Sequence, residues 1–61
     1  MPTYEVNFWL MNIRGEKKTV EPTMTLSGDF ANEEEALSTL GPTFRDAYPH
    51  KTFLAEAVTV S

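Results

Sequence analysis

Residues 3–13 predict a strand that is apolar on both faces, and no other feature constrains the fold of this 61-residue chain so strongly. The side chains alternate from Thr3 to Ile13, as they do in a β-strand. One face carries Tyr4, Val6, Phe8 and Leu10, and the other carries Glu5, Asn7, Trp9, Met11 and Ile13. A single helical layer covers only one face of a sheet, so the apolar residues of the other face need a different cover.

The length and composition predict one domain, residues 1–61, with little stability to spare. The chain has no cysteine, which excludes disulfides and thiolate metal sites. Its longest apolar run, "FWLM", is four residues, and the N-terminus lacks the basic and apolar regions of a signal peptide. We therefore expect a cytoplasmic protein without a membrane segment.

The charge balance argues against direct nucleic-acid binding, since nine acidic and five basic residues give a net charge of −4. The charges are also segregated along the sequence, with Arg14, Lys17 and Lys18 in one segment and Asp29, Glu33, Glu34 and Glu35 in another. This distribution favours another protein as the partner.

Two further strands are predicted by alternation. "RGEKK" reads as a hairpin loop, with Gly15 able to adopt a positive φ, and it leads into a second strand from Thr19 to Ser27. Pro22 lacks an N–H, which suits an edge strand or a bulge. A third strand is expected from Lys51 to Val60, with Leu54, Val58 and Val60 on one face and Phe53, Ala55 and Ala57 on the other.

A helix is expected to begin after Asn32, because Asn32 and Glu35 form a capping-box pattern. Its apolar stripe consists of Leu37, Leu40, Phe44 and Tyr48. Pro42 would clash with the carbonyl of Ser38, so the sequence predicts either a kink or a short helix 33–40 followed by a second turn that begins at Pro42. Pro49 is expected to end the helical segment.

The expected fold is α+β in ββαβ order: a three-stranded antiparallel sheet with one Pro-kinked or interrupted helix packed on one face. The predicted core consists of Tyr4, Val6, Phe8, Leu10, Val20, Met24 and Leu26 against Leu37, Leu40 and Phe44. Trp9, Met11 and Ile13 then form an open apolar patch, either an interface or aromatic pairing across a solvated sheet face. On this view Trp9→Ala costs ~1 kcal/mol of folding free energy and Phe8→Ala ~3–5 kcal/mol.

No catalytic, metal or cofactor site is expected. His50 is the only histidine, and it lies in a predicted loop. The three glycines are isolated, so no phosphate-binding loop is present. A chain this short also has difficulty enclosing a substrate pocket. An enzyme is therefore not expected.

The helix start "EEALSTL" and the C-terminal strand "FLAEAVTV" complete an order of elements that resembles the small early proteins of bacteriophages. The layout is similar to the podovirus inhibitors of bacterial RNA polymerase, with Glu35, Ala36 and Leu37 matching their helix start. The C-terminal strand lacks the arginines that these inhibitors carry. The resemblance implies a non-enzymatic inhibitor of a host protein such as RNA polymerase or another nucleic-acid enzyme.

Three functional hypotheses follow. The first is a protein-binding module, whose candidate contact residues are Trp9, Met11, Ile13, Arg14, Lys17, Lys18, Glu33, Glu34 and Glu35. The second is a homodimeric structural or assembly protein whose open faces pair. The third is an inhibitor in which the acidic helix start imitates DNA.

Overall fold

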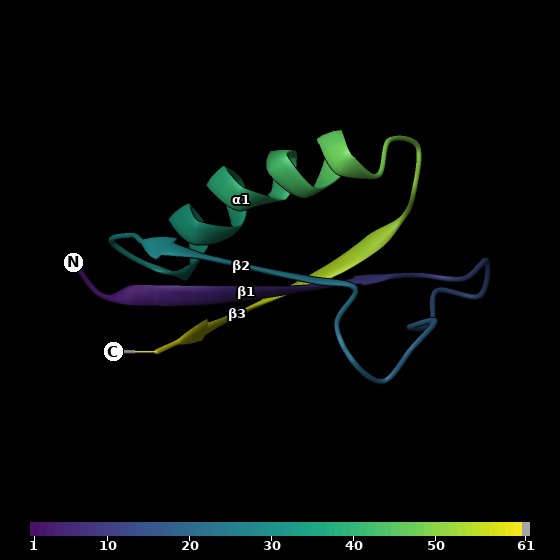
Figure 1. Ribbon diagram of the computed structural model, residues 1–61, viewed down its shortest axis with the longest axis horizontal. Helices are drawn as coiled ribbons and strands as arrows, with labels where there is room; N and C mark the ends of the chain where they lie inside the picture. The colour runs from purple at the N-terminus through teal and green to yellow at the C-terminus, as the bar shows by residue number, and fades with distance from the viewer. Residues whose placement is uncertain (61) are drawn as a thin grey trace.

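The computed structural model describes residues 1–60 and has the element order ββαβ (Figure 1). The elements are β1 (Thr3–Leu10), β2 (Met24–Asp29), α1 (Glu33–Ala47) and β3 (Phe53–Thr59). The three strands form an antiparallel sheet in the order β2-β1-β3, and α1 packs on one face. The predicted α+β class and strand–strand–helix–strand order are confirmed.

The strand with two apolar faces, β1, is the central strand. Tyr4 pairs with Gly28 of β2 and Thr59 of β3, and Phe8 pairs with Met24 and Ala55. Side chains of paired residues share a face, so Phe53, Ala55 and Ala57 of β3 lie on the helix side with Tyr4, Val6 and Phe8. Leu54, Val58 and Val60 therefore belong to the open face.

The connection between β1 and β2 is longer than the sequence predicted. It spans residues 11–23, because β1 ends at Leu10 and β2 begins only at Met24. Pro22 lacks the N–H that a paired strand position needs, which fits the late start of β2. Val20 is wrong as a core residue, since its side chain is 95% exposed.

Helix α1 begins as predicted, with Asn32 as its N-cap. The Asn32 Oδ1 accepts a hydrogen bond from the Glu35 N–H at 2.8 Å, and Glu35 Oε2 accepts one from the Ala31 N–H at 3.3 Å. The helix continues through Pro42 to Ala47, so of the two predicted alternatives the short helix 33–40 followed by a second turn is wrong. Phe44, fully buried just beyond Pro42, anchors this last part of the helix to the sheet.

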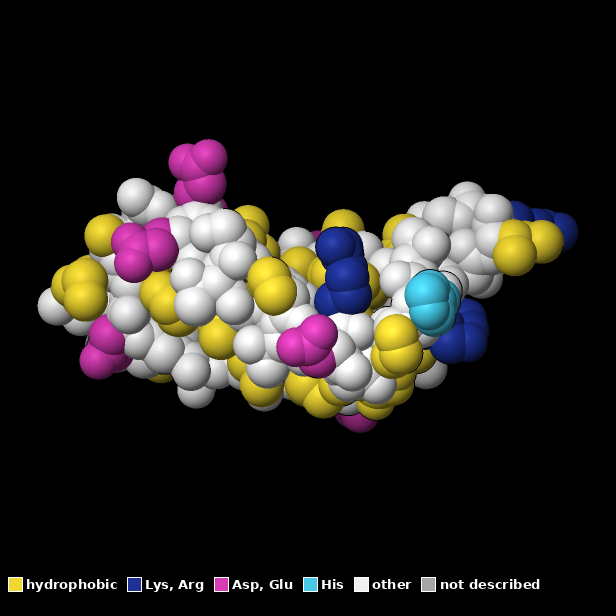
Figure 2. Space-filling view, turned by 90° about the horizontal axis from the view of Figure 1, so that it is seen from above, with side chains coloured by type: hydrophobic (Ala, Val, Ile, Leu, Met, Phe, Trp, Pro, Cys, Tyr) yellow, Lys and Arg dark blue, Asp and Glu magenta, His cyan; other side chains and the backbone are white. Residues whose placement is uncertain are grey.

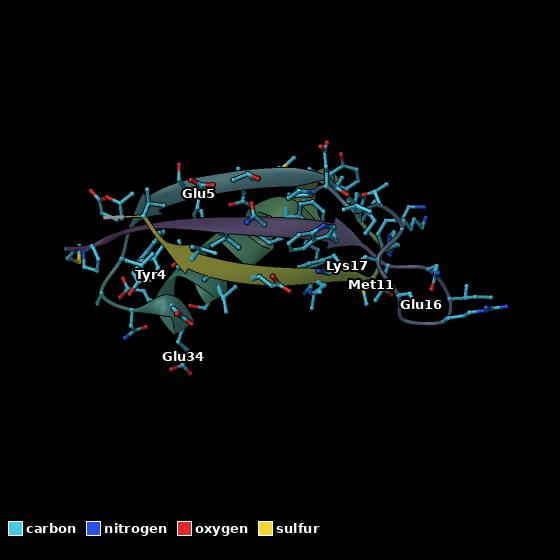
Figure 3. All side chains as sticks on the ribbon, turned by 90° about the horizontal axis from the view of Figure 1, so that it is seen from below. Tyr4, Glu5, Met11, Glu16, Lys17 and Glu34 are labelled. Carbon is cyan, nitrogen blue, oxygen red and sulfur yellow. The ribbon has the colours of Figure 1, made fainter. Side chains whose placement is uncertain are left out.

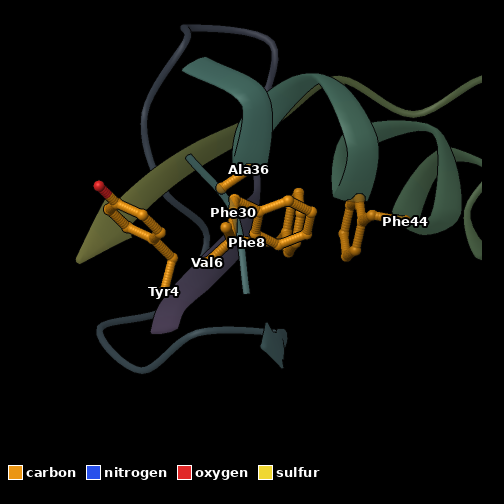
Figure 4. Packing of buried hydrophobic residues seen from close by; sticks show 6 residues of the cluster. All are labelled: Tyr4, Val6, Phe8, Phe30, Ala36 and Phe44. Atoms are coloured by element: carbon orange, nitrogen blue, oxygen red, sulfur yellow. The ribbon is translucent and has the colours of Figure 1, made fainter. Parts of the chain in front are cut away.

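Stacked aromatic rings form much of the core between α1 and the sheet (Figure 4). Phe8 and Phe44 are parallel, with ring centroids 4.6 Å apart and planes 4° apart, and Phe53 meets both edge-on. The buried cluster comprises Tyr4, Val6, Phe8, Phe30, Ala36 and Phe44.

Phe30 is a core residue that the sequence analysis did not predict. Its ring packs over Gly28, where a Cβ would lie 2.9 Å from the Phe30 Cε2. Glycine at position 28 leaves room on β2 for this ring.

Candidate protein-interaction surface

Trp9 lies on the face of the sheet opposite α1, yet it is only 7% exposed. Residues 18–23 return across this end of the sheet, and the Trp9 Nε1–H donates a hydrogen bond to the Val20 carbonyl at 3.1 Å. The expectation that Trp9 forms part of an open apolar patch is wrong, because the long connection supplies the cover that the helix does not.

Lys17 also lies over Trp9. Its Nζ is 4.0 Å from the centroid of the indole ring and 3.5 Å from the Glu56 carboxylate on β3. The ammonium group thus makes a cation–π contact and an ion pair together. The side chains of Lys17 and Glu56 are both partly exposed, so solvent weakens the ion pair and its contribution to stability is small. The two contacts of Lys17 nevertheless fix where the loop lies over the sheet.

Residues 12–16 form a tight turn at the far end of the loop, closed by the bridge between Met11 and Lys17. The Asn12 N–H donates to the Glu16 carbonyl at 2.9 Å, and the Gly15 N–H to the Asn12 carbonyl at 3.0 Å. The Asn12 Oδ1 accepts from the Arg14 and Glu16 N–H groups at 2.8 and 3.0 Å. Gly15 adopts φ 79°, which glycine does at low cost. The turn is therefore held in one conformation by its own hydrogen bonds.

Ile13 and Arg14 lie on this turn, and the side chain of Ile13 is fully exposed, at 104%. The loop extends beyond the end of the sheet as an arm with apolar and basic side chains at its end (Figure 2). Figure 3 shows Glu16 and Lys17 at this end and Glu34 at the opposite end of the molecule. We call residues 12–16 the turn tip.

The charges are unevenly distributed along the long axis of the molecule, which measures 36 Å against 22 and 15 Å. The five Lys and Arg residues all belong to segments that meet at the turn-tip end: the loop, the end of α1 and the start of β3. They are Arg14, Lys17, Lys18, Arg45 and Lys51. Glu16, Glu21, Asp46 and Glu56 lie in the same half of the molecule, so this half is close to neutral. The opposite end, which we call the acidic end, contains Glu5, Asp29, Glu33, Glu34 and Glu35 and no Lys or Arg. In Figure 2 the dark-blue side chains accordingly occupy one half of the molecule.

The structure thus brings together only part of the predicted contact set. Ile13, Arg14 and Lys18 are exposed on the loop, whereas Met11 is half-buried and Trp9 is covered. The three glutamates of the helix start are exposed but lie at the other end.

Two elements of this surface were missed from the sequence. The role of Asn12 could have been predicted, because an asparagine side chain in a turn readily forms hydrogen bonds with the backbone just after it. The role of the Val20 carbonyl could not, since every residue has a backbone carbonyl.

Residues 1–60 contain no pocket and no group of three His, Cys, Asp or Glu side chains placed to hold a metal ion. The helix of this part of the chain, α1, is not long and apolar enough to cross a membrane.

No protein-family model, curated protein or solved structure matches the chain.

Proposed function

We propose that this protein is a non-enzymatic protein-binding module and that the turn tip inserts into its partner. The observation that carries the proposal is a fully exposed isoleucine on a turn held by four hydrogen bonds. A preorganised contact loses little conformational entropy on binding, so more of its burial energy appears as affinity. Isolated exposed apolar residues are common, and the support comes from the combination of exposure with a fixed backbone.

The proposed partner surface follows from the chemistry of the turn tip. Ile13 requires an apolar depression, and Arg14 beside it requires carboxylates at the rim. Lys18 is exposed on the same loop and adds to the positive charge, whereas Lys17 is already engaged by Trp9 and Glu56. An acidic protein with a small apolar pocket has this chemistry.

The experiment is affinity capture from a bacterial lysate with three immobilised proteins: the unaltered chain, Ile13→Ser and Val20→Ser. Val20 is the matched control, since its aliphatic side chain is 95% exposed on the same loop but outside the turn tip. A protein retained by the unaltered chain and by Val20→Ser, but lost with Ile13→Ser, supports the proposal. Equal retention by all three contradicts it.

A narrower form of the proposal makes the chain a phage-type inhibitor of a host enzyme such as RNA polymerase, and the resemblance in layout supports it. It is tested by in vitro transcription with bacterial RNA polymerase in the presence of the same three proteins. Inhibition that Ile13→Ser relieves and Val20→Ser does not is the expected result. If transcription runs at the uninhibited rate with each of the three proteins, RNA polymerase is not the target.

The acidic end favours a second candidate, an inhibitor that imitates DNA. Five carboxylates gather there without a Lys or Arg, and such a field attracts DNA-binding surfaces. The test is Glu33→Lys with Glu34→Lys, because both side chains are exposed and, unlike Glu35, make no hydrogen bond in the helix cap. Loss of inhibition of a DNA-binding enzyme in this variant, with inhibition by Ile13→Ser intact, selects this candidate.

A further inference from the structure

Residues 19–22 cover Trp9, but little attaches them to the rest of the molecule. The connection that contains them lies on the side of the sheet opposite α1 (Figure 1). Among residues 1–60, the hydrogen bond from the Trp9 Nε1–H to the Val20 carbonyl is the only one that joins this segment to another part of the chain. All four residues are exposed, and the side chain of Val20 is 95% exposed. The segment therefore covers the indole without burying a side chain of its own.

The residues on either side of this segment are bonded to β1. The Lys18 N–H donates to the Leu10 carbonyl at 3.0 Å, and the Thr23 N–H donates to the Phe8 carbonyl at 2.7 Å. The Thr23 hydroxyl also accepts a hydrogen bond from the Leu10 N–H at 3.3 Å. Residues 19–22 thus have two fixed ends and a single attachment between them.

The segment also carries constraints of its own. The Thr19 hydroxyl donates a hydrogen bond to the Glu21 carbonyl at 2.7 Å, and the ring of Pro22 fixes its φ. Because both constraints lie within the segment, they remain when it moves away from the sheet. The segment can therefore return to the same position over Trp9.

We propose that residues 19–22 are a lid that opens and closes over Trp9 while the sheet stays folded. Opening breaks one hydrogen bond and uncovers the edge of the indole that carries Nε1–H. Segments with few buried apolar contacts are the parts of a protein that open locally, at a smaller cost than global unfolding. Lys17 lies outside the lid and stays over the indole ring in both states.

The lid decides when Trp9 can be contacted. In the closed state the side chain is 7% exposed, and in the open state it presents a free N–H and an apolar ring edge. Tryptophan is among the residues that contribute most to protein interfaces. A ligand that binds only the open state has its affinity lowered by the fraction of molecules that are open. The lid therefore restricts use of this contact, and it does so independently of Ile13.

Hydrogen exchange of the Trp9 indole N–H, followed by NMR, tests the lid in the unaltered chain. Its protection factor, the intrinsic exchange rate divided by the observed rate, is expected to be at least about tenfold below that of the Val6 N–H in the centre of the sheet. The Lys18 and Thr23 N–H groups at the fixed ends should be better protected than the indole. A difference from Val6 of less than about tenfold overturns the proposal. Lys18 and Thr23 groups that exchange as freely as the indole also overturn it, because the whole connection then separates from β1.

Val20→Gly loosens the lid, and Ile13→Gly is its matched control. Both side chains are aliphatic and exposed on the same loop, but Ile13 lies on the turn tip. Glycine gives the open segment more conformational freedom, so Val20→Gly should speed exchange of the indole N–H by about 2- to 5-fold. Ile13→Gly should leave it unchanged. An equal change in both variants, or none in either, shows that the indole exchanges by another route and overturns the lid.

The lid is separate from the turn tip, because the bridge between Met11 and Lys17 lies between them. Failure of the lid is therefore distinguishable from failure of the proposed function. A chain that captures a partner through Ile13 while its indole is as protected as Val6 removes the lid and leaves the binding module. Rapid indole exchange in a chain that captures no partner does the reverse.

Discussion

The indole Nε1–H of Trp9 and the carbonyl of Val20 are 3.1 Å apart, and this hydrogen bond joins the middle of the sheet to the long β1–β2 connection. Without this connection, the Trp9 indole on the open face of the sheet would face water. Trp9 is also the only tryptophan, so its fluorescence reports whether the loop lies in place.

Replacing Trp9 tests this relationship. Because Trp9 is buried, Trp9→Ala is expected to cost ~3–5 kcal/mol of unfolding free energy, comparable with Phe8→Ala and well above the ~1 kcal/mol expected for an exposed residue. Trp9→Phe keeps most of the apolar contact but loses the hydrogen bond and should cost ~1 kcal/mol or somewhat more. Urea unfolding followed by far-UV circular dichroism measures these changes. A cost below ~1 kcal/mol for Trp9→Ala would contradict the covered indole.

The Phe8–Phe44 stack is expected to couple the two residues energetically. Parallel rings 4.6 Å apart gain more than their buried area accounts for, so a double-mutant cycle with Phe8→Leu and Phe44→Leu should give a coupling of ~0.5–1.5 kcal/mol. The control cycle pairs Phe8→Leu with Val20→Ala at the exposed loop position. No coupling in the first cycle would show that the rings act independently.

Two glycine substitutions are expected to have opposite signs. Gly28→Ala places a Cβ 2.9 Å from the Phe30 ring and should destabilise the protein by ~1–3 kcal/mol. Gly41→Ala adds one inside α1, where no atom outside the neighbouring residues and the helix backbone lies within 4 Å. It should stabilise the protein by up to ~1 kcal/mol, less the cost of a Cβ directly before Pro42. Thermal and urea melts compare the two.

The cause of the Gly28 effect has its own check. Phe30→Leu combined with Gly28→Ala should recover part of the loss relative to the two single variants, because the smaller side chain removes the overlap. If the changes in unfolding free energy of the two single variants simply add, overlap with the Phe30 ring is not the cause of the Gly28→Ala loss.

Asn12→Ala is expected to loosen the turn tip. The change removes the acceptor for the Arg14 and Glu16 N–H groups, at a cost of ~1 kcal/mol because both groups reach water. Amide hydrogen exchange should quicken at these two residues but not at Lys18, whose N–H bonds to the Leu10 carbonyl. Unchanged exchange at Arg14 and Glu16 would show that the asparagine side chain does not hold the turn.

The sequence predicted the parts of the fold that depend on local patterns. Alternation identified β1, and Asn32 with Glu35 identified the start of α1, because side-chain period and capping depend on neighbouring residues. The end of the first strand, Phe30 in the core and the continuation of α1 through Pro42 depend on tertiary packing, which no local pattern carries. The burial of Trp9, one of the predicted contact residues, was missed for the same reason, because the acceptor of its hydrogen bond is a backbone carbonyl.

The central position of β1 also decides when this chain becomes able to fold during its synthesis. Tyr4 of β1 pairs with Thr59 of β3. Among the three strands β1 is therefore synthesised first, but it cannot complete its pairing until β3, the last, has been synthesised. Until β3 emerges, β1 has one unpaired side, and Phe53, which packs edge-on against Phe8, is missing from the core. We expect a nascent chain that ends before Phe53 to remain unfolded and prone to aggregate, and native structure to form only after residues 53–59 are free.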